Sequence, residues 1–214
     1  MVEPLLSDCL ERRFVREVSM RPAVFLDRDG VLTIPEFRHG RSFAPLTLED
    51  FSIYPEAPAA VQRLSEAGFL LIVVTNQPDV AYGRIQRETL EEMHRKLHSL
   101  LCLDDIQVCS HGREDKCNCR KPLPGMIARA ANRLNVDLAN SFLIGDRASD
   151  IEAGRSAGCR TVFVDRYYTS EPKPEDPDFI CSDVAQAADW ILSLEEKLER
   201  SSAGSRAKVE LGGI

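Results

Sequence analysis

The chain has 214 residues, 43% of them hydrophobic, and a formal net charge of -7. This hydrophobic content suffices for a buried core, and no apolar run approaches the roughly 20 residues of a membrane-spanning helix, so we expect no membrane contact. The negative charge argues against a protein that covers nucleic-acid phosphates, because such proteins usually carry a basic stripe. An odd number of cysteines, seven, and no secretory signal in residues 1–20 favour reduced thiols and a cytoplasmic location.

Short apolar runs alternate with helical patterns along the chain. The runs are rich in branched or aromatic residues and are bounded by polar residues or glycine, as buried parallel strands are. They cover Ala23–Leu26, Phe69–Val74, Ile106–Cys109, Phe142–Ile144 and Thr161–Val164. Between and after them, apolar residues recur at helical spacing in Val61–Ala67, Leu90–Leu100, Ile127–Leu134 and Val184–Leu194. The alternation predicts an α/β fold, a three-layer Rossmann-like sandwich with a central parallel sheet.

The ends of the chain look different from this core. Residues 199–214 have mixed charge, several glycines and little periodicity, which predicts a flexible tail. We therefore expect one domain over residues 21–198, an N-terminal extension over residues 1–20 and a tail over residues 199–214.

Polar residues follow four of the predicted strands. The carboxyl ends of parallel strands share one edge of the sheet, so groups far apart in the sequence converge there. The residues concerned are Asp27 and Asp29 after the first strand, Thr75 and Asn76 after the second, Lys121 beyond the third and Asp146 after the fourth.

Three carboxylates at one edge, those of Asp27, Asp29 and Asp146, predict a cation. A pair of like unit charges about 4 Å apart repels by roughly 4 kcal/mol at an effective dielectric of about 20. Oxygen ligands without histidine favour Mg²⁺, which also takes a substrate phosphate oxygen. The carboxylate of Asp27 would attack a phosphoryl group held there and form an aspartyl-phosphate, with Asp29 moving the protons. Thr75, the amides at and after Asn76, and Lys121 would balance the charge of the transferring group.

Each of these residues also has an ordinary structural interpretation. Asp27 and Asp29 suit a turn or a helix cap, Thr75 and Asn76 suit a turn, and Asp146 suits a solvated helix face. The coincidence of all of them at predicted strand ends favours the catalytic interpretation.

A cluster of cysteine and histidine follows the third strand. The pattern C-x-H-x5-C-x-C suits a closed tetrahedral Zn²⁺ site, which is structural. Because the loop over residues 109–119 ends directly before Arg120 and Lys121, folding around zinc would fix both cations against the substrate phosphate. The alternative is a set of free cysteines with a solvated histidine. The predicted ligands are Cys109, His111, Cys117 and Cys119.

The ordered motifs resemble those of the haloacid dehalogenase superfamily of phosphohydrolases, over about Pro22 to Val164. They are Asp27-Arg28-Asp29-Gly30, Thr75-Asn76-Gln77, Lys121-Pro122, and Gly145-Asp146 with Asp150. The resemblance implies that Asp27 is the nucleophile, Asp29 the acid/base, Asp146 a Mg²⁺ ligand and Asp150 a supporting carboxylate.

The zinc loop followed by Cys119-Arg120-Lys121-Pro122 is similar to one capless branch of this superfamily. That branch contains the D-glycero-D-manno-heptose 1,7-bisphosphate 7-phosphatases and the histidinol-phosphate phosphatases. The resemblance implies no large cap domain, a substrate contact by Arg120, and a small phosphate ester, of the heptose bisphosphate type, as substrate. The alternatives are a histidinol-phosphate phosphatase, a DNA 3′-phosphatase and a non-catalytic zinc-stabilised binding module. We expect a monomer.

Some positions depart from this pattern or have two interpretations. Tyr82 stands where the heptose enzymes commonly have arginine, which weakens the substrate assignment. The loop over residues 35–50 carries Arg38, His39 and Arg41, which either meet a second phosphate or are solvated. Two more histidines, His94 and His98, have no acid or cysteine partners in the pattern, so we interpret them as a solvated helix flank rather than as metal ligands.

Overall fold

The computed structural model describes residues 20–210 and the side chains of residues 20–197. Nearly all of the predicted N-terminal extension, and residues 211–214 of the predicted tail, lie outside this range. None of the helices in the described part of the chain has the length and apolar character that crossing a bilayer requires.

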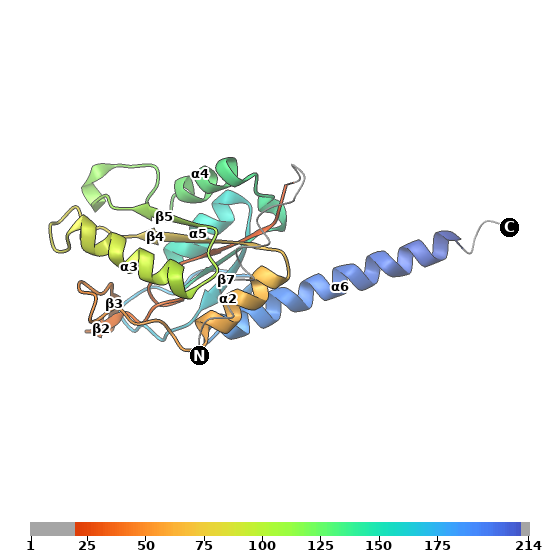
Figure 1. Ribbon diagram of the computed structural model, residues 1–214, viewed down its shortest axis with the longest axis horizontal. Helices are drawn as coiled ribbons and strands as arrows, with labels where there is room; N and C mark the ends of the chain where they lie inside the picture. The colour runs from red at the N-terminus through yellow and green to blue at the C-terminus, as the bar shows by residue number, and fades with distance from the viewer. Residues whose placement is uncertain (1–19, 211–214) are drawn as a thin grey trace.

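A six-stranded sheet in which every pairing is parallel forms the centre of the molecule (Figure 1). The five predicted strands are all present, and a sixth strand, β8, was not predicted. After β1 the chain forms β4 and β5 on one side of it and then crosses to form β6, β7 and β8 on the other side. A crevice is expected at the carboxyl end of the sheet where the strand order reverses in this way. In spatial order the strands are β5 (Asp105–Cys109), β4 (Leu70–Asn76), β1 (Ala23–Leu26), β6 (Phe142–Gly145), β7 (Arg160–Val164) and β8 (Phe179–Cys181).

Helices cover both faces of the sheet and confirm the predicted three-layer sandwich. On one face lie α2 (Ala57–Glu66), α3 (Arg87–Leu100) and α6 (Val184–Glu210), and on the other lie α4 (Gly125–Leu134) and α5 (Ala148–Ala157). Side chains alternate between the two cores along each strand. Val24 and Leu26 of β1 face the first core, whereas Ala23 and Phe25 face the second. The short 3-10 helices are η1 (Arg113–Asp115) and η2 (Leu138–Asn140).

A small antiparallel hairpin, β2 (Glu36–Arg38) and β3 (Arg41–Phe43), lies beside the sheet after β1 (Figure 1). It occupies the loop for which no secondary structure was predicted. No described segment forms a separate cap domain, which agrees with the predicted capless architecture.

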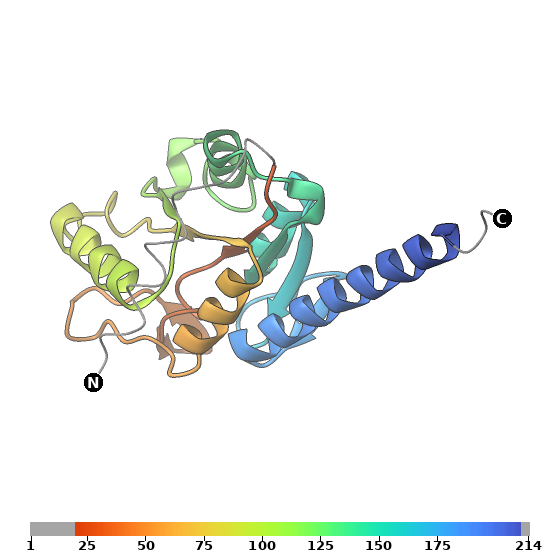
Figure 2. The same ribbon diagram turned by 45° about the vertical axis from the view of Figure 1, so that its right-hand side comes forward.

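Helix α6 is longer than predicted and leads away from the sheet (Figure 2). It continues to Glu210, so residues 199–210, predicted as a flexible tail, are helical. Extending an existing helix adds one hydrogen bond for each residue ordered and needs no new nucleus, so weak periodicity does not end it.

Candidate active site

The carboxyl ends of β1, β4 and β6 bring the predicted site residues to one place. Asp27 follows β1 directly, Thr75 is the second-to-last residue of β4, and Asp146 follows β6 directly. Lys121 reaches them from a distant part of the chain, and its Nζ donates to Asp27 Oδ1 at 2.7 Å and to the carbonyl of Val74 at 2.7 Å. The convergence expected from the strand ends is therefore present.

Asp27 is a buried carboxylate with one committed oxygen. Its Oδ1 accepts the hydrogen bond from Lys121, whereas no described residue donates to its Oδ2. Burial and the charge of Asp150 raise the pKa of Asp27, the charge of Lys121 lowers it, and the net result is a pKa of about 6. The carboxylate is therefore ionised at neutral pH but costly to bury, which favours a positive charge beside it.

Asp146 shows the clearest unmet demand for a cation. Its Oδ2 accepts a hydrogen bond from the hydroxyl of Tyr168 at 2.7 Å, but its buried Oδ1 has no partner. Burial and the charges of Asp27 and Asp150 raise its pKa well above the ordinary value. Carboxylate oxygens of Asp27, Asp146 and Asp150 lie within 4.8 Å of one another.

Asp150 joins this cluster, and its buried Oδ1 has an ion-pair partner but, like Oδ1 of Asp146, no partner in hydrogen-bonding geometry. Its Oδ2 accepts the backbone N–H of Arg147 at 3.0 Å and caps α5, and its Oδ1 forms an ion pair with Lys121 at 2.7 Å. Gly145 makes this approach possible, because a side chain there would collide with Asp150. These contacts fit the supporting role expected for Asp150.

Asp29 lies outside the three-carboxylate cluster, although it was predicted to be a Mg²⁺ ligand. Both its oxygens accept hydrogen bonds instead, from Arg28 at 3.0 and 2.8 Å, Thr33 at 2.9 Å and Gln77 at 2.7 Å. Burial alone would raise its pKa, but the charge and hydrogen bonds of Arg28, together with Gln77 and Thr33, lower it overall. The side chain is thus held as an anion beside the cluster, and both its carboxylate oxygens already accept hydrogen bonds.

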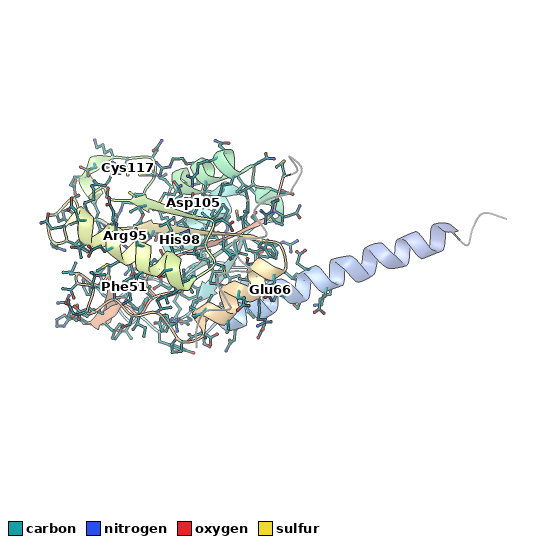
Figure 3. All side chains as sticks on the ribbon, in the orientation of Figure 1. Phe51, Glu66, Arg95, His98, Asp105 and Cys117 are labelled. Carbon is teal, nitrogen blue, oxygen red and sulfur yellow. The ribbon has the colours of Figure 1, made fainter. Side chains whose placement is uncertain are left out.

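The buried Arg28 and the half-buried His94 form a support behind Asp29 that sequence reasoning missed. Arg28 is fully buried, and its Nη1 lies 3.1 Å from His94 Nε2. Burial and the charge of Arg28 lower the pKa of His94 to about 4, so the ring is neutral and accepts the hydrogen bond. The interpretation of His94 as solvated was wrong, whereas His98, one turn further along α3, is exposed (Figure 3).

Thr75 and Asn76 both line the cavity but use their side chains differently. Thr75 Oγ1 accepts a hydrogen bond from Gln77 at 2.8 Å and keeps its own proton to donate. Asn76 donates to the carbonyl of Lys121 and accepts from its backbone N–H, both at 3.1 Å. The side-chain amide of Asn76 is therefore committed to placing Lys121, whereas the phosphoryl contact predicted for this residue involves its backbone amide.

The cysteine and histidine side chains after β5 gather in one cluster, with all four ligand atoms within 4.8 Å of one another. Cys117, labelled in Figure 3, lies with its Sγ 3.7 Å from that of Cys109. His111 Nδ1 lies 3.2 Å from Cys119 Sγ. Two sulfurs bound to one tetrahedral zinc at about 2.3 Å stand roughly 3.8 Å apart, so the donor set and spacing fit Zn²⁺.

A cavity of about 720 Å³ opens above the carboxylates, and the cations that line it outnumber the carboxylates although the chain is acidic. Arg120, the predicted substrate contact, lines it and donates to the carbonyl of His111 at 3.4 Å. Arg38 and His39 line a smaller neighbouring hollow instead. The lining cations are Arg41, Arg84, Arg113, Lys116, Arg120, Lys121 and Arg147, and the lining carboxylates are Asp27, Asp29, Asp79, Asp150 and Glu171.

Comparisons with known proteins agree with this geometry. A model of the HAD-hydrolase-like family matches residues 118–187. A D-glycero-beta-D-manno-heptose-1,7-bisphosphate 7-phosphatase of Pseudomonas aeruginosa is 34% identical over 181 residues, which cover 80% of this chain and 98% of that protein. The chain belongs to the haloacid dehalogenase-like phosphatases. As a member of this family it is a phosphoric monoester hydrolase, which sets aside the alternative of a non-catalytic binding module.

Solved structures place the chain close to one group of these phosphatases. The D,D-heptose 1,7-bisphosphate phosphatase of Bordetella bronchiseptica, solved with magnesium and phosphate, superposes with a TM-score of 0.69 at 32% identity. The match covers 80% of this chain and 98% of that one. A D-glycero-beta-D-manno-heptose-1,7-bisphosphate 7-phosphatase of Yersinia pestis is 33% identical over 184 residues, which cover 80% of this chain.

Proposed function

We propose that this phosphatase hydrolyses a small sugar bisphosphate of the D-glycero-D-manno-heptose 1,7-bisphosphate type, through a phosphoryl group carried on Asp27. The observation that carries the proposal is the arrangement around Lys121. One buried ammonium orients Asp27 beneath a cationic cavity, while Asp146 beside it keeps an oxygen free.

Asp27 would be the nucleophile. Its Oδ1 is held by Lys121, which leaves Oδ2 to attack phosphorus and form the new P–O bond as the ester P–O bond breaks. Burial alone would lower the pKa of Lys121, but Asp150 and Asp27 raise it overall, so this lysine stays charged throughout the reaction. Lys121 and the hydroxyl of Thr75 would then balance charge on the phosphoryl oxygens.

The residues that would hold Mg²⁺ are Asp27 and Asp146, with Asp150 beside them, because carboxylate oxygens of these three residues gather within 4.8 Å of one another, whereas both carboxylate oxygens of Asp29 accept hydrogen bonds from neighbouring side chains. Bound there, Mg²⁺ supplies a Lewis acid that neutralises the phosphoryl oxygens. Hard carboxylate donors without nitrogen or sulfur suit this ion.

Asp29 would move the protons. A phosphoryl group bound nearby carries negative charge and raises the pKa of the neighbouring carboxyl, so Asp29 can protonate the leaving oxygen. The resulting carboxylate then takes a proton from the water that attacks phosphorus and releases phosphate from Asp27. Arg28, Gln77 and Thr33 hold its orientation for both steps.

The cysteine loop would act by position. Zn²⁺ held by Cys109, His111, Cys117 and Cys119 would fix the loop that carries Arg120 and leads into Lys121. This role is structural, because four protein donors leave no open position on the metal.

A second phosphate on the substrate would explain the surplus of cations. Lys121 is occupied by carboxylates, but Arg41, Arg113 and Lys116 line the cavity and form no ion pair with any described residue. These cations would meet the phosphate at the far end of a sugar whose near phosphate lies over Asp27. The names of the relatives support a bisphosphate of heptose over histidinol phosphate, which has one phosphate only.

Steady-state kinetics test the assignment. The ratio kcat/KM for D-glycero-D-manno-heptose 1,7-bisphosphate should exceed that for histidinol phosphate and for the same heptose with the distant phosphate removed. The variant Asp27→Asn, assayed in parallel, supplies the background rate for each compound. A higher kcat/KM for histidinol phosphate would overturn the substrate assignment and leave the phosphatase chemistry standing.

A further inference from the structure

Tyr168 makes a contact with the proposed metal site that the family motifs do not include. It lies in the segment after β7, and its hydroxyl donates to Asp146 Oδ2 at 2.7 Å. The other oxygen of the same carboxylate, Oδ1, is the buried atom without a partner. One oxygen is therefore tied down and the other is left available.

We infer that Tyr168 is a positioning residue that fixes the orientation of Asp146 and so raises the affinity of the site for Mg²⁺. The inference rests on the proposed magnesium site. A carboxylate on a metal is better organised when its remaining oxygen accepts a hydrogen bond, because the group then loses less freedom on binding. Without the hydroxyl, no described side chain would donate a hydrogen bond to Asp146, which lies beside two other buried carboxylates that repel it.

The ring of Tyr168 is itself held in place by the β2–β3 hairpin. It stacks on Phe37 with ring centroids 5.8 Å apart and an interplanar angle of 24°. The segment after β7 is joined to the hairpin by Ser170, whose N–H donates to the carbonyl of Gly40 at 3.1 Å and whose hydroxyl donates to that of His39 at 3.0 Å. The hairpin thus contributes to the metal site through an aromatic contact.

Gly30 shows how closely this contact is built. Its φ is +94°, and a Cβ there would collide with Asp146 and stand 2.9 Å from the hydroxyl oxygen of Tyr168. Only a glycine leaves room for the tyrosine and the carboxylate to meet at this point. The space around Asp146 is therefore shaped for the hydroxyl as well as for a cation.

Calorimetric titration of the metal-free full chain with MgCl₂ tests the inference without a substrate. Tyr168→Phe keeps the ring and removes the hydroxyl, so Kd for Mg²⁺ should rise about 10-fold, as expected for loss of such a supporting contact. Tyr167→Phe, at the exposed neighbouring tyrosine, is the matched control and should leave Kd unchanged. In assays, the Mg²⁺ concentration for half-maximal rate should rise by the same factor while kcat at saturating Mg²⁺ is kept.

The outcomes separate this inference from the proposal beneath it. Suppose that Asp146→Asn no longer binds Mg²⁺ but Tyr168→Phe binds it as tightly as the wild type or more tightly. That result would overturn the positioning role of Tyr168 and leave the proposed magnesium site standing. If Asp146→Asn bound Mg²⁺ as the wild type does, the proposed site would fail and this inference with it.

A second variant tests the part played by the hairpin. Phe37→Leu removes the stacked ring and leaves the hydroxyl of Tyr168, so Kd should rise by a smaller factor, about threefold, in line with the strength of one aromatic pair. An unchanged Kd in Phe37→Leu would remove the hairpin from the inference and leave the hydroxyl contact intact.

Discussion

The two candidate metal sites of this phosphatase are built in opposite ways. The carboxylate cluster draws Asp27, Asp146 and Asp150 from different elements of the fold, and Lys121 joins it from 94 positions along the chain from Asp27. The cysteine cluster takes its ligands from the last residue of β5, Cys109, and from the loop that follows it, all within residues 109–119. The carboxylate cluster therefore forms only when the sheet is folded, whereas the cysteine cluster can fold its own loop around a metal.

This difference separates chemistry from stability. At the carboxylate cluster a protein cation, Lys121, already pairs with two of the three acids, so the fold there does not depend on a metal. Apart from any within η1, no backbone–backbone hydrogen bond of the described residues involves residues 110–119 of the cysteine loop. Loss of metal should therefore stop the reaction at the first site and loosen the structure at the second.

The largest effect is expected for Asp27→Asn. Removing the nucleophile should lower kcat for phosphate release by about 10,000-fold or more, with melting temperature and zinc content unchanged. The exposed control Asp189→Asn on α6 should keep full activity. Substantial activity in Asp27→Asn would show that the carboxylate cluster is not the reaction centre.

Next in size is Lys121→Met, measured by urea unfolding of the metal-free protein. Two buried carboxylates would lose their counterion, and the free energy of unfolding should fall by about 3 kcal/mol. Lys173→Met breaks an exposed ion pair with Asp165 and should cost less than about 1 kcal/mol. Equal losses in the two variants would contradict the view that Lys121 takes the place of a structural cation.

Cys117→Ser tests the other side of the comparison. We expect loss of bound zinc, a decrease of about 2 kcal/mol in the free energy of unfolding, and lower activity, because the loop also carries Arg120. Zinc analysis, urea unfolding and kcat/KM measure the three effects. Cys102→Ser changes a cysteine outside the cluster and should retain its zinc; full activity in a zinc-free Cys117→Ser protein would refute a structural metal.

The smallest effect concerns the support behind Asp29. In the folded protein the pKa of His94 is about 4 instead of 6.5, so between these values the unfolded chain holds a proton that the folded chain lacks. The contribution of this group to stability is therefore present above about pH 6.5 and is lost as pH falls toward 4.

His94→Gln keeps an acceptor for Arg28 and removes the titration. Between about pH 7 and pH 5 the wild type should lose on the order of 1 kcal/mol more of its unfolding free energy than this variant, by urea titration. His98→Gln, an exposed histidine of the same helix, should behave as the wild type does. A pH dependence that is the same in all three proteins would place His94 in solvent.

Local patterns determined much of this protein. Alternating apolar runs and helical spacing predicted five of the six strands and the three layers, because burial on two sheet faces leaves a periodic signal within each segment. The cysteine cluster could also be predicted, because its four ligands are close together in the sequence. The order of the catalytic motifs indicated the family and the sheet edge at which Asp27, Asp146 and Lys121 meet.

Only the tertiary structure decided how each polar atom is used. In the folded chain Asp150 lies in the carboxylate cluster and Asp29 lies outside it. The side-chain amide of Asn76 binds Lys121, the half-buried His94 contacts Arg28, and Tyr168 binds Asp146. These partners lie in different elements, and none leaves a periodic signal in the other's segment. Hydrogen-bond partners of buried groups are selected by packing, which short-range spacing does not encode.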